Sequence, residues 1–146
     1  MTVDVVTTIV IARPRPVVSA FAADPDRAPA WYQNIKAVEW KTQPALAVGS
    51  QAAFIARFLG RRLAYTYEVV EWRPNERFIM RTVDGPFPME TTYLWEDAEG
   101  GATRMTLRNR GTPTGFSFWV APLIARAMRH ANRKDLAALK GLLESS

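Results

Sequence analysis

One carboxylate in the C-terminal part of the sequence occupies a position where ionisation is costly. Asp135 lies in a segment without glycine or proline between Pro122 and Gly141, and the apolar residues of this segment recur at helical spacing. In a helical projection Asp135 falls near the middle of the apolar face, where a carboxylate must be paired or neutralised. Such an acid can bind a polar group of a ligand, or act as a base with a raised pKa. The structural alternative is pairing with a tyrosine or arginine of a neighbouring element, or displacement outward by a bend.

Four further polar side chains fall on strand positions that the alternation of polar and apolar residues directs toward the interior. In an apolar cavity each could orient a hydroxyl or carbonyl group of a ligand. A tyrosine could also polarise a carbonyl during an aldol-type cyclisation. Alternatively, these groups satisfy one another or line the core with their rings. They are Tyr65, Tyr67, Tyr93 and Asn109.

Two of the five tryptophans flank the expected mouth of such a cavity. Trp31 falls on a short helix near the N-terminus, and Trp119 at the start of a long C-terminal helix. We interpret both as candidate ligand contacts, with ordinary core packing as the alternative. The segment 112–119 contains a glycine and two phenylalanines and is predicted to form an apolar lip, which would also suit a membrane surface.

Several kinds of chemistry are excluded or disfavoured by residues that the sequence lacks. It contains no cysteine, which excludes disulfide scaffolds, zinc fingers, cysteine nucleophiles and thiolate-bound iron–sulfur clusters. The single histidine, His130, projects to the solvent side of the long helix and the carboxylates are scattered, so we expect no metal site. Glycine-rich phosphate-binding motifs and a nucleophile elbow are also absent. We therefore expect no cofactor, and any catalysis would rest on general acid–base groups in a shaped pocket.

The 146-residue chain has 19 lysines and arginines against 14 acids, a net charge of +5. This balance gives only a weak preference for anionic partners. Basic residues form a stripe on the outer face of the long helix and a row on the outer face of the predicted sheet. No aromatic residue is interleaved with the stripe, so nucleic-acid binding is disfavoured. The stripe comprises Arg126, Arg129, Arg133 and Lys140, and the row comprises Arg104, Arg108 and Arg110.

The order of elements follows from the hydrophobic periodicity and from proline and glycine punctuation. A strand rich in β-branched residues comes first, then two short helices, six strands with short connections, and an amphipathic helix. Six successive strands with short connections predict an antiparallel meander. The predicted strands are 3–12, 35–42, 51–59, 62–72, 77–83, 89–96 and 103–110, and the predicted helices are 17–23, 27–32 and 115–144.

No linker, repeat or low-complexity stretch divides the chain, so we expect a single domain over residues 1–146. A curved antiparallel sheet must cover one of its faces, and only the C-terminal helix is long enough to do so. The inner face of the sheet then includes Met80, and the inner face of the helix includes Ile124 and Met128. Small residues on the helix face would leave space for a cavity, or alternatively allow helix and sheet to approach closely. They are Ala127, Ala131 and Ala138, with Leu142 on the same face.

Three stretches of the sequence carry a resemblance to a known family. VTTIVIARPRPVVSAFAADPDRAPAWY resembles its first strand, proline and short helix pair, which end here near Trp31. VGSQAAFIARFLGRRLAYTYEVVEWRPNERFIMRT resembles its central hairpins, with Gly49, Gly60, Glu71, Pro74 and Phe78 at the usual places. ANRKDLAALKGLLE resembles the end of its long helix. The chain is thus similar to the START-like, SRPBCC or helix-grip superfamily, in particular to its polyketide cyclase/dehydrase and lipid-transport group.

The resemblance implies an α+β helix-grip fold: a curved seven-stranded antiparallel sheet wrapped around a long C-terminal helix, with two short helices after the first strand. It also implies binding of a small apolar or amphipathic ligand of lipid, polyketide or isoprenoid type between sheet and helix. It supplies no fixed catalytic motif, because the superfamily hosts binders, transporters, cyclases and regulators. The alternatives are a polyketide aromatase/cyclase that uses general acid–base catalysis, and a ribosome- or membrane-associated interaction module. The candidate cavity residues are Trp31, Tyr65, Tyr67, Met80, Tyr93, Asn109, Trp119, Ile124, Met128 and Asp135.

The same features suggest where the protein acts. No apolar run is long enough to span a membrane, and the first residues lack both a basic region and an unbroken apolar stretch. We therefore expect a cytoplasmic protein, a monomer or homodimer, whose partner is a small molecule. Peripheral contact with a membrane surface is kept as an alternative.

Overall fold

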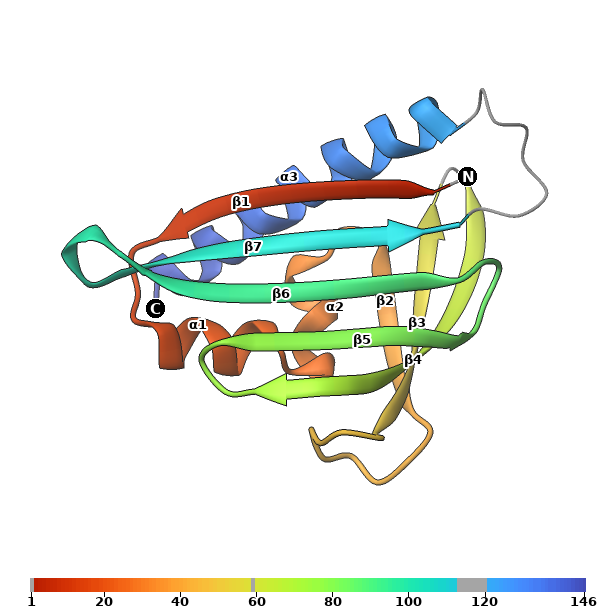
Figure 1. Ribbon diagram of the computed structural model, residues 1–146, viewed down its shortest axis with the longest axis horizontal. Helices are drawn as coiled ribbons and strands as arrows, with labels where there is room; N and C mark the ends of the chain where they lie inside the picture. Colours follow the sequence, from red (N-terminus) through yellow and green to blue (C-terminus); the bar gives the residue numbers. More distant parts are fainter. Residues whose placement is uncertain (1, 59, 113–120) are drawn as a thin grey trace.

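A curved antiparallel sheet and a long helix make up most of the structure (Figure 1). This computed structural model describes residues 2–58, 60–112 and 121–146. The strands are β1 (Val3–Ile11), β2 (Ile35–Trp40), β3 (Gln51–Phe58), β4 (Arg61–Arg73), β5 (Arg77–Asp84), β6 (Met89–Ala98) and β7 (Ala102–Gly111). The helices are α1 (Arg15–Ala22), α2 (Ala28–Trp31) and α3 (Ala121–Glu144), with 3-10 turns η1 (Pro25–Arg27) and η2 (Glu99–Gly101).

The strands pair in the order β1-β7-β6-β5-β4-β3-β2, and each neighbouring pair is antiparallel. Strands β2 to β7 therefore form the predicted meander. The first strand, β1, pairs with the last, β7, and lies at one edge of the sheet, with Val3 opposite Gly111. The sheet curves around α3, so the predicted α+β helix-grip architecture is confirmed (Figure 1).

Prolines and an aspartate set the ends of the first elements. β1 ends before Pro14, which fixes φ and cannot donate a ladder hydrogen bond. Pro16 lies in the first turn of α1, where a missing amide proton costs little. The side chain of Asp24 accepts a hydrogen bond of 3.0 Å from the backbone N–H of Asp26 and caps η1. α2 follows η1 directly, and Trp31 at the end of α2 is buried.

Two register shifts interrupt the pairing of β4 with β5, the first with an extra residue in β5 and the second with an extra residue in β4. The register with β5 shifts just before Tyr67 and again between Val69 and Glu71. After the second shift Trp72 faces the interior, and its ring centroid lies 5.6 Å from that of Phe78. A β-bulge bends a strand and increases its twist, so both shifts help the sheet to curve around α3.

The buried apolar residues form two separate clusters. The larger cluster lies between the sheet, α1, α2 and the C-terminal half of α3, and contains Trp31, Phe78 and Leu139. The smaller cluster joins the start of β1 to the start of α3 through residues such as Val5 and Ile124. The interior is therefore apolar at both ends of α3.

α3 lies along β1 and contacts α2 (Figure 1). Near its C-terminal end, the ammonium group of Lys140 donates a hydrogen bond of 2.8 Å to the carbonyl oxygen of Val10. Near its N-terminal end, Ile124 packs in one cluster with Val5. β1 and α3 therefore run in the same direction, and the middle of the strand faces the middle of the helix.

The buried face of α3 agrees with the predicted one at Ile124 and Asp135 and differs from it at one edge. It follows Leu136 and Leu139. Ala138 is exposed and Leu142 keeps 43% of its surface exposed, so the prediction that these two face inward is wrong. Alanine occurs on several sides of the helix and tolerates both environments, so periodicity alone could not select the face. The other alanines predicted to face inward, Ala127 and Ala131, are half-buried.

Candidate functional site

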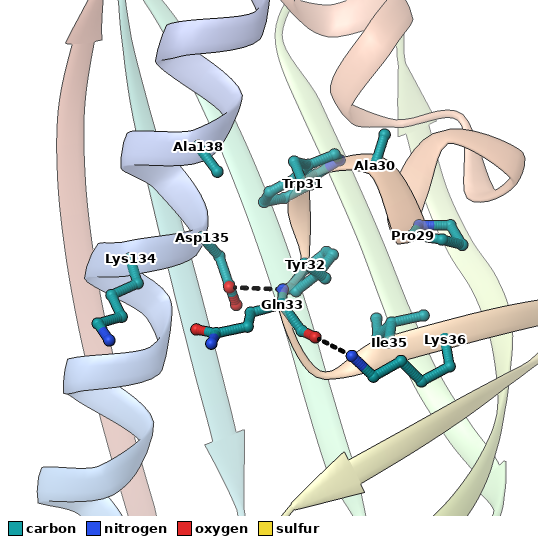
Figure 2. A pocket seen from close by; sticks show the side chains of 10 residues that line it. All are labelled: Pro29, Ala30, Trp31, Tyr32, Gln33, Ile35, Lys36, Lys134, Asp135 and Ala138. Carbon is teal, nitrogen blue, oxygen red and sulfur yellow. Dashed lines mark hydrogen bonds between the residues drawn. The ribbon is translucent and has the colours of Figure 1, made fainter.

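A cleft of about 380 Å³ opens between the turn that joins α2 to β2 and the middle of α3 (Figure 2). Asp135 and Trp31, both predicted site residues, contribute to its wall. The exposed residues Lys36 and Lys134 lie on its rim. The remaining lining residues are Pro29, Ala30, Tyr32, Gln33, Ile35 and Ala138.

Asp135 is buried, with 3% of its surface exposed. Its Oδ1 atom accepts a hydrogen bond of 2.9 Å from the backbone N–H of Gln33 (Figure 2). Burial raises the pKa of Asp135 to about 6, and the hydrogen bond from Gln33 opposes this rise. The partner is thus a backbone amide in the α2–β2 turn, where the sequence suggested a tyrosine or arginine side chain. The carboxylate is mainly ionised at neutral pH, and its pKa suits the acceptance of a proton.

Two tyrosines connect the cleft to the inner face of the sheet. Tyr32 lines the cleft, and its hydroxyl group hydrogen-bonds the hydroxyl group of Tyr93 on the inner face of β6. Trp31 packs beside both rings, with centroids 4.0 Å from Tyr32 and 5.9 Å from Tyr93. Burial raises the pKa of Tyr32 and of Tyr93, and the negative charge of Asp135 adds to both rises. Both hydroxyl groups are therefore neutral at neutral pH, and the field of Asp135 reaches the inner face.

Further neutral polar groups continue along this inner face. The hydroxyl group of Thr91 donates a hydrogen bond of 2.7 Å to Oδ1 of Asn109. Burial raises the pKa of Tyr67 to about 12, and a hydrogen bond with Thr91 acts in the opposite direction. The ring of Tyr65 lies 6.3 Å from that of Tyr67, and both side chains are half-buried. We refer to these neutral groups as the polar row: Tyr32, Tyr65, Tyr67, Thr91, Tyr93 and Asn109.

Two buried polar atoms near the middle of β1 and α3 have no hydrogen-bond partner among the described residues. They are Oγ1 of Thr7 and Nδ2 of Asn132. Thr7 lies between Val5 of the smaller cluster and Ile11 of the larger, and Asn132 holds the corresponding place on α3. Most buried polar atoms in proteins are paired, so these two atoms are exceptions for which the described residues supply no partner. The indole nitrogens of Trp31 and Trp95 are also without partners in the described part of the chain.

The structure places the predicted site residues in separate regions. Trp31 and Asp135 line the cleft. Ile124 and Met128 belong to the smaller apolar cluster at the start of α3. Residues 113–119 of the predicted lip over 112–119, Trp119 among them, lie outside the described residues. The inner face of the sheet brings together Tyr65, Tyr67, Met80, Tyr93 and Asn109.

Sequence reasoning missed four polar residues that the structure places in or beside the site. Thr7 interrupts a series of valines and isoleucines on the inner side of β1, which is a weak signal. Asn132 lies in a helix segment rich in charged residues, so nothing in the sequence separates it from a surface residue. The alternation of β6 directs Thr91 inward with Tyr93, but its hydrogen bond to Asn109 of β7 was not predicted, and Tyr32 joins the site only through its contact with Tyr93.

The basic residues on the outer face of the sheet are largely paired with acids. Arg108 contacts Asp4 at 2.6 Å, and Glu90 contacts Arg81 at 2.8 Å and Arg110 at 3.0 Å. Hydrogen bonding from Arg81, aided by Arg110, holds the pKa of Glu90 below its usual value. These pairs neutralise much of the predicted basic row and weaken the argument for an anionic partner on this face.

The described part of the chain contains neither a cluster of potential metal ligands nor a helix suited to span a membrane. Its histidine, aspartate and glutamate residues form no group of three or more placed to hold a metal ion. None of the described helices combines the length and apolar character of a membrane span. His130 is exposed on α3, as the helical projection predicted.

A family model matches nearly the whole chain. The family is described as polyketide cyclase/dehydrase and lipid transport, and the match covers residues 2–144. No match is found among curated proteins.

Solved structures share the fold at low sequence identity. A protein from Thermus thermophilus has a TM-score of 0.83 at 19% identity, with 97% of each chain covered. A START superfamily protein from Mycobacterium smegmatis has a TM-score of 0.80 at 15% identity, again with 97% of each chain covered. The Zhui aromatase/cyclase from a Streptomyces species has a TM-score of 0.82 at 14% identity, covering 99% of this chain and 94% of that one. At these identities the likeness establishes the fold alone.

Proposed function

Because the chain belongs to the polyketide cyclase/dehydrase and lipid transport family, we propose that it binds a small, largely apolar ligand between the sheet and α3. The family and the START-like fold are those of ligand-binding proteins. A lipid, polyketide or isoprenoid compound is the ligand class that the family description and the apolar surroundings favour.

The observation that carries this proposal is the polar row on an otherwise apolar inner face. Its hydroxyl and amide groups stand among buried apolar residues such as Phe78 and Met80. An amphipathic molecule matches such a surface, because its apolar part can pack on the rings and its oxygen atoms can bind the hydroxyl groups. Most of these groups already hydrogen-bond one another, as Tyr32 with Tyr93 and Thr91 with Asn109, and a hydroxyl group in such a pair can still form a further hydrogen bond to a ligand.

We assign the cleft as the entrance to this region. Its volume of about 380 Å³ falls within the range of small-molecule sites. The side chain of Tyr32 forms the boundary between the cleft and the inner face, held by its hydrogen bond to Tyr93. The bond between Asp135 and Gln33 ties the same turn to α3. Movement of Tyr32 would therefore connect the cleft with the other members of the polar row.

Native mass spectrometry of the purified protein, followed by solvent extraction, tests the proposal directly. A co-purifying apolar compound is the expected result and would identify the ligand class. A ligand-free mass would be followed by titration with fatty acids, polyphenols and isoprenoid alcohols, monitored by tryptophan fluorescence and calorimetry. Absence of binding across that panel would contradict the proposal.

A pair of threonine variants tests the role of the polar row. We expect Thr91→Val to weaken ligand affinity about three- to tenfold, because it removes a hydroxyl group on the inner face and leaves Asn109 unpaired. The matched control is Thr92→Val, on the opposite face of the same strand. Equal affinities of the two variants would show that the ligand does not reach the polar row.

A second candidate function is catalysis of a cyclisation in the same place. The observation that favours it is Asp135, a carboxyl group with a pKa of about 6 whose charge acts on Tyr32 and Tyr93. In this reading Asp135 removes a proton next to a ketone and a tyrosine hydroxyl group donates a hydrogen bond to the developing enolate. Incubation with a synthetic poly-β-ketone separates the two functions, since a binding protein returns its ligand unchanged. A cyclised product lost in Asp135→Asn would establish catalysis.

A further inference from the structure

The interior of this protein has an electrostatic bias. None of the 19 lysine and arginine residues is buried, and all of them lie in the described part of the chain. Asp135 is the one buried charged residue among the described residues. An anionic ligand group that entered beside it would add a second negative charge and meet no buried cation. Burying a charge without a partner is among the costliest changes in a protein interior.

The two lysines at the cleft do not reverse this bias. Lys36 and Lys134 are exposed, so water and salt screen their charges from the interior. The ammonium group of Lys36 also donates a hydrogen bond of 2.9 Å to the carbonyl oxygen of Gln33. Their positive charges on the rim nevertheless disfavour passage of a cation toward Asp135.

The buried polar atoms of Thr7 and Asn132 that have no hydrogen-bond partner indicate which kind of ligand atom would suit them. Nδ2 of Asn132 is a donor, and the hydroxyl group of Thr7 can donate as well as accept. Both are buried at the boundary between the two apolar clusters. An uncharged oxygen acceptor between two apolar portions of a ligand would satisfy these donors, because its apolar portions could pack on the clusters at either side.

We propose that the ligand bears an uncharged oxygen function, such as a ketone, an ester or a hydroxyl group, and that the site selects against free carboxylates. This inference rests on the proposed binding function and narrows its ligand class. It separates neutral polyketide, ester and alcohol ligands from free fatty acids.

Calorimetric titration with three ligands of one skeleton tests the selectivity. The probes are 2-acetylnaphthalene, 2-naphthoate and 2-methylnaphthalene, which share the apolar ring system and differ in the attached group. At neutral pH we expect the ketone to bind about tenfold more tightly than the carboxylate. We expect the hydrocarbon to bind about three- to tenfold more weakly than the ketone, because it leaves the donors of Thr7 and Asn132 unsatisfied.

Two variants test whether the donors of Thr7 and Asn132 cause the preference for the ketone over the hydrocarbon. Thr7→Val and Asn132→Leu each replace an unpartnered buried polar atom by an apolar group, so the fold is expected to be retained. Both are expected to bring the affinity for the ketone close to that for the hydrocarbon. Thr8→Val, the neighbouring substitution on the exposed side of β1, is the matched control and is expected to keep the wild-type preference. Asp135→Asn is expected to narrow the difference between ketone and carboxylate.

The outcomes distinguish this inference from the function on which it rests. Equal or tighter binding of 2-naphthoate would overturn the inference and leave the proposed function standing. If both Thr7→Val and Asn132→Leu kept the wild-type preference for the ketone over the hydrocarbon, the donors of Thr7 and Asn132 would not bind the ligand oxygen. Absence of binding by all three probes would overturn the proposed function, and the inference with it.

Discussion

At Asp135, burial and a hydrogen bond act in opposite directions on one carboxyl group. Burial raises its pKa from 3.8 to about 6, although the backbone N–H of Gln33 stabilises the ionised form. The ionised group therefore costs the folded state free energy at neutral pH. A residue that lowers stability and yet tethers the α2–β2 turn to α3 fits a role in the site better than a role in packing.

The sign of this effect gives a testable pH dependence. Because the folded pKa lies above the unfolded one, the contribution of Asp135 to stability is fully present below about pH 4 and is lost as the pH rises through about 6. We expect Asp135→Asn to raise the free energy of unfolding at neutral pH by on the order of 2 kcal/mol, with little effect near pH 4. Urea denaturation at both pH values measures the difference. Exposed Asp84→Asn is the control, and an equal effect of the two substitutions at neutral pH would contradict this account.

At the scale of elements, β1 and α3 contribute residues to both apolar clusters. Their buried polar residues Thr7 and Asn132 lie between the two clusters. The strands could be predicted because their alternation and turn residues are local signals, and the meander followed from short connections. The buried face of α3 could be predicted only in part: Asp135 is buried as the helical projection indicated, whereas tertiary packing leaves Ala138 and Leu142 outside. The alternation placed Tyr67 and Tyr93 correctly on the inner face. Their link through Tyr32 and Thr91 depends on contacts between distant segments, which no local pattern carries.

Two leucines of α3 test the observed orientation of this helix. Leu139 has no exposed surface and packs in the larger cluster, whereas Leu142 keeps 43% of its surface exposed. We expect Leu139→Ala to lower the free energy of unfolding by about 3 kcal/mol and Leu142→Ala by less than about 1 kcal/mol. Chemical denaturation of both variants measures the two losses. Similar losses would mean that the helix buries Leu142 as well as Leu139, in contradiction to the observed orientation.

At the scale of the whole molecule, a bound ligand would complete a core that the chain alone leaves divided. The two clusters meet at unpartnered polar atoms, so a ligand placed there would contact β1, α3 and the sheet together. A ligand that binds only the folded state stabilises it by about 2.7 kcal/mol at a hundredfold excess over its dissociation constant. We therefore expect the melting temperature to rise with ligand concentration and hydrogen exchange to slow in β1 and α3. A rise of the same size in Thr91→Val and the wild type at equal ligand concentration would argue against binding at the polar row.

The pairing of β1 with β7 and α3 also has a consequence for how the chain matures. Val3 pairs with Gly111, and the carbonyl of Val10 is bound by Lys140, so the partners of this strand are synthesised long after it. Until then a valine-rich segment with unpaired backbone groups remains open to other chains. Contacts between such distant residues also slow folding, because the intervening loop must close first. We expect newly made protein to be prone to aggregation until β7 pairs with β1 and α3 packs against it, and we expect sequestration of β1 by a chaperone to raise the yield.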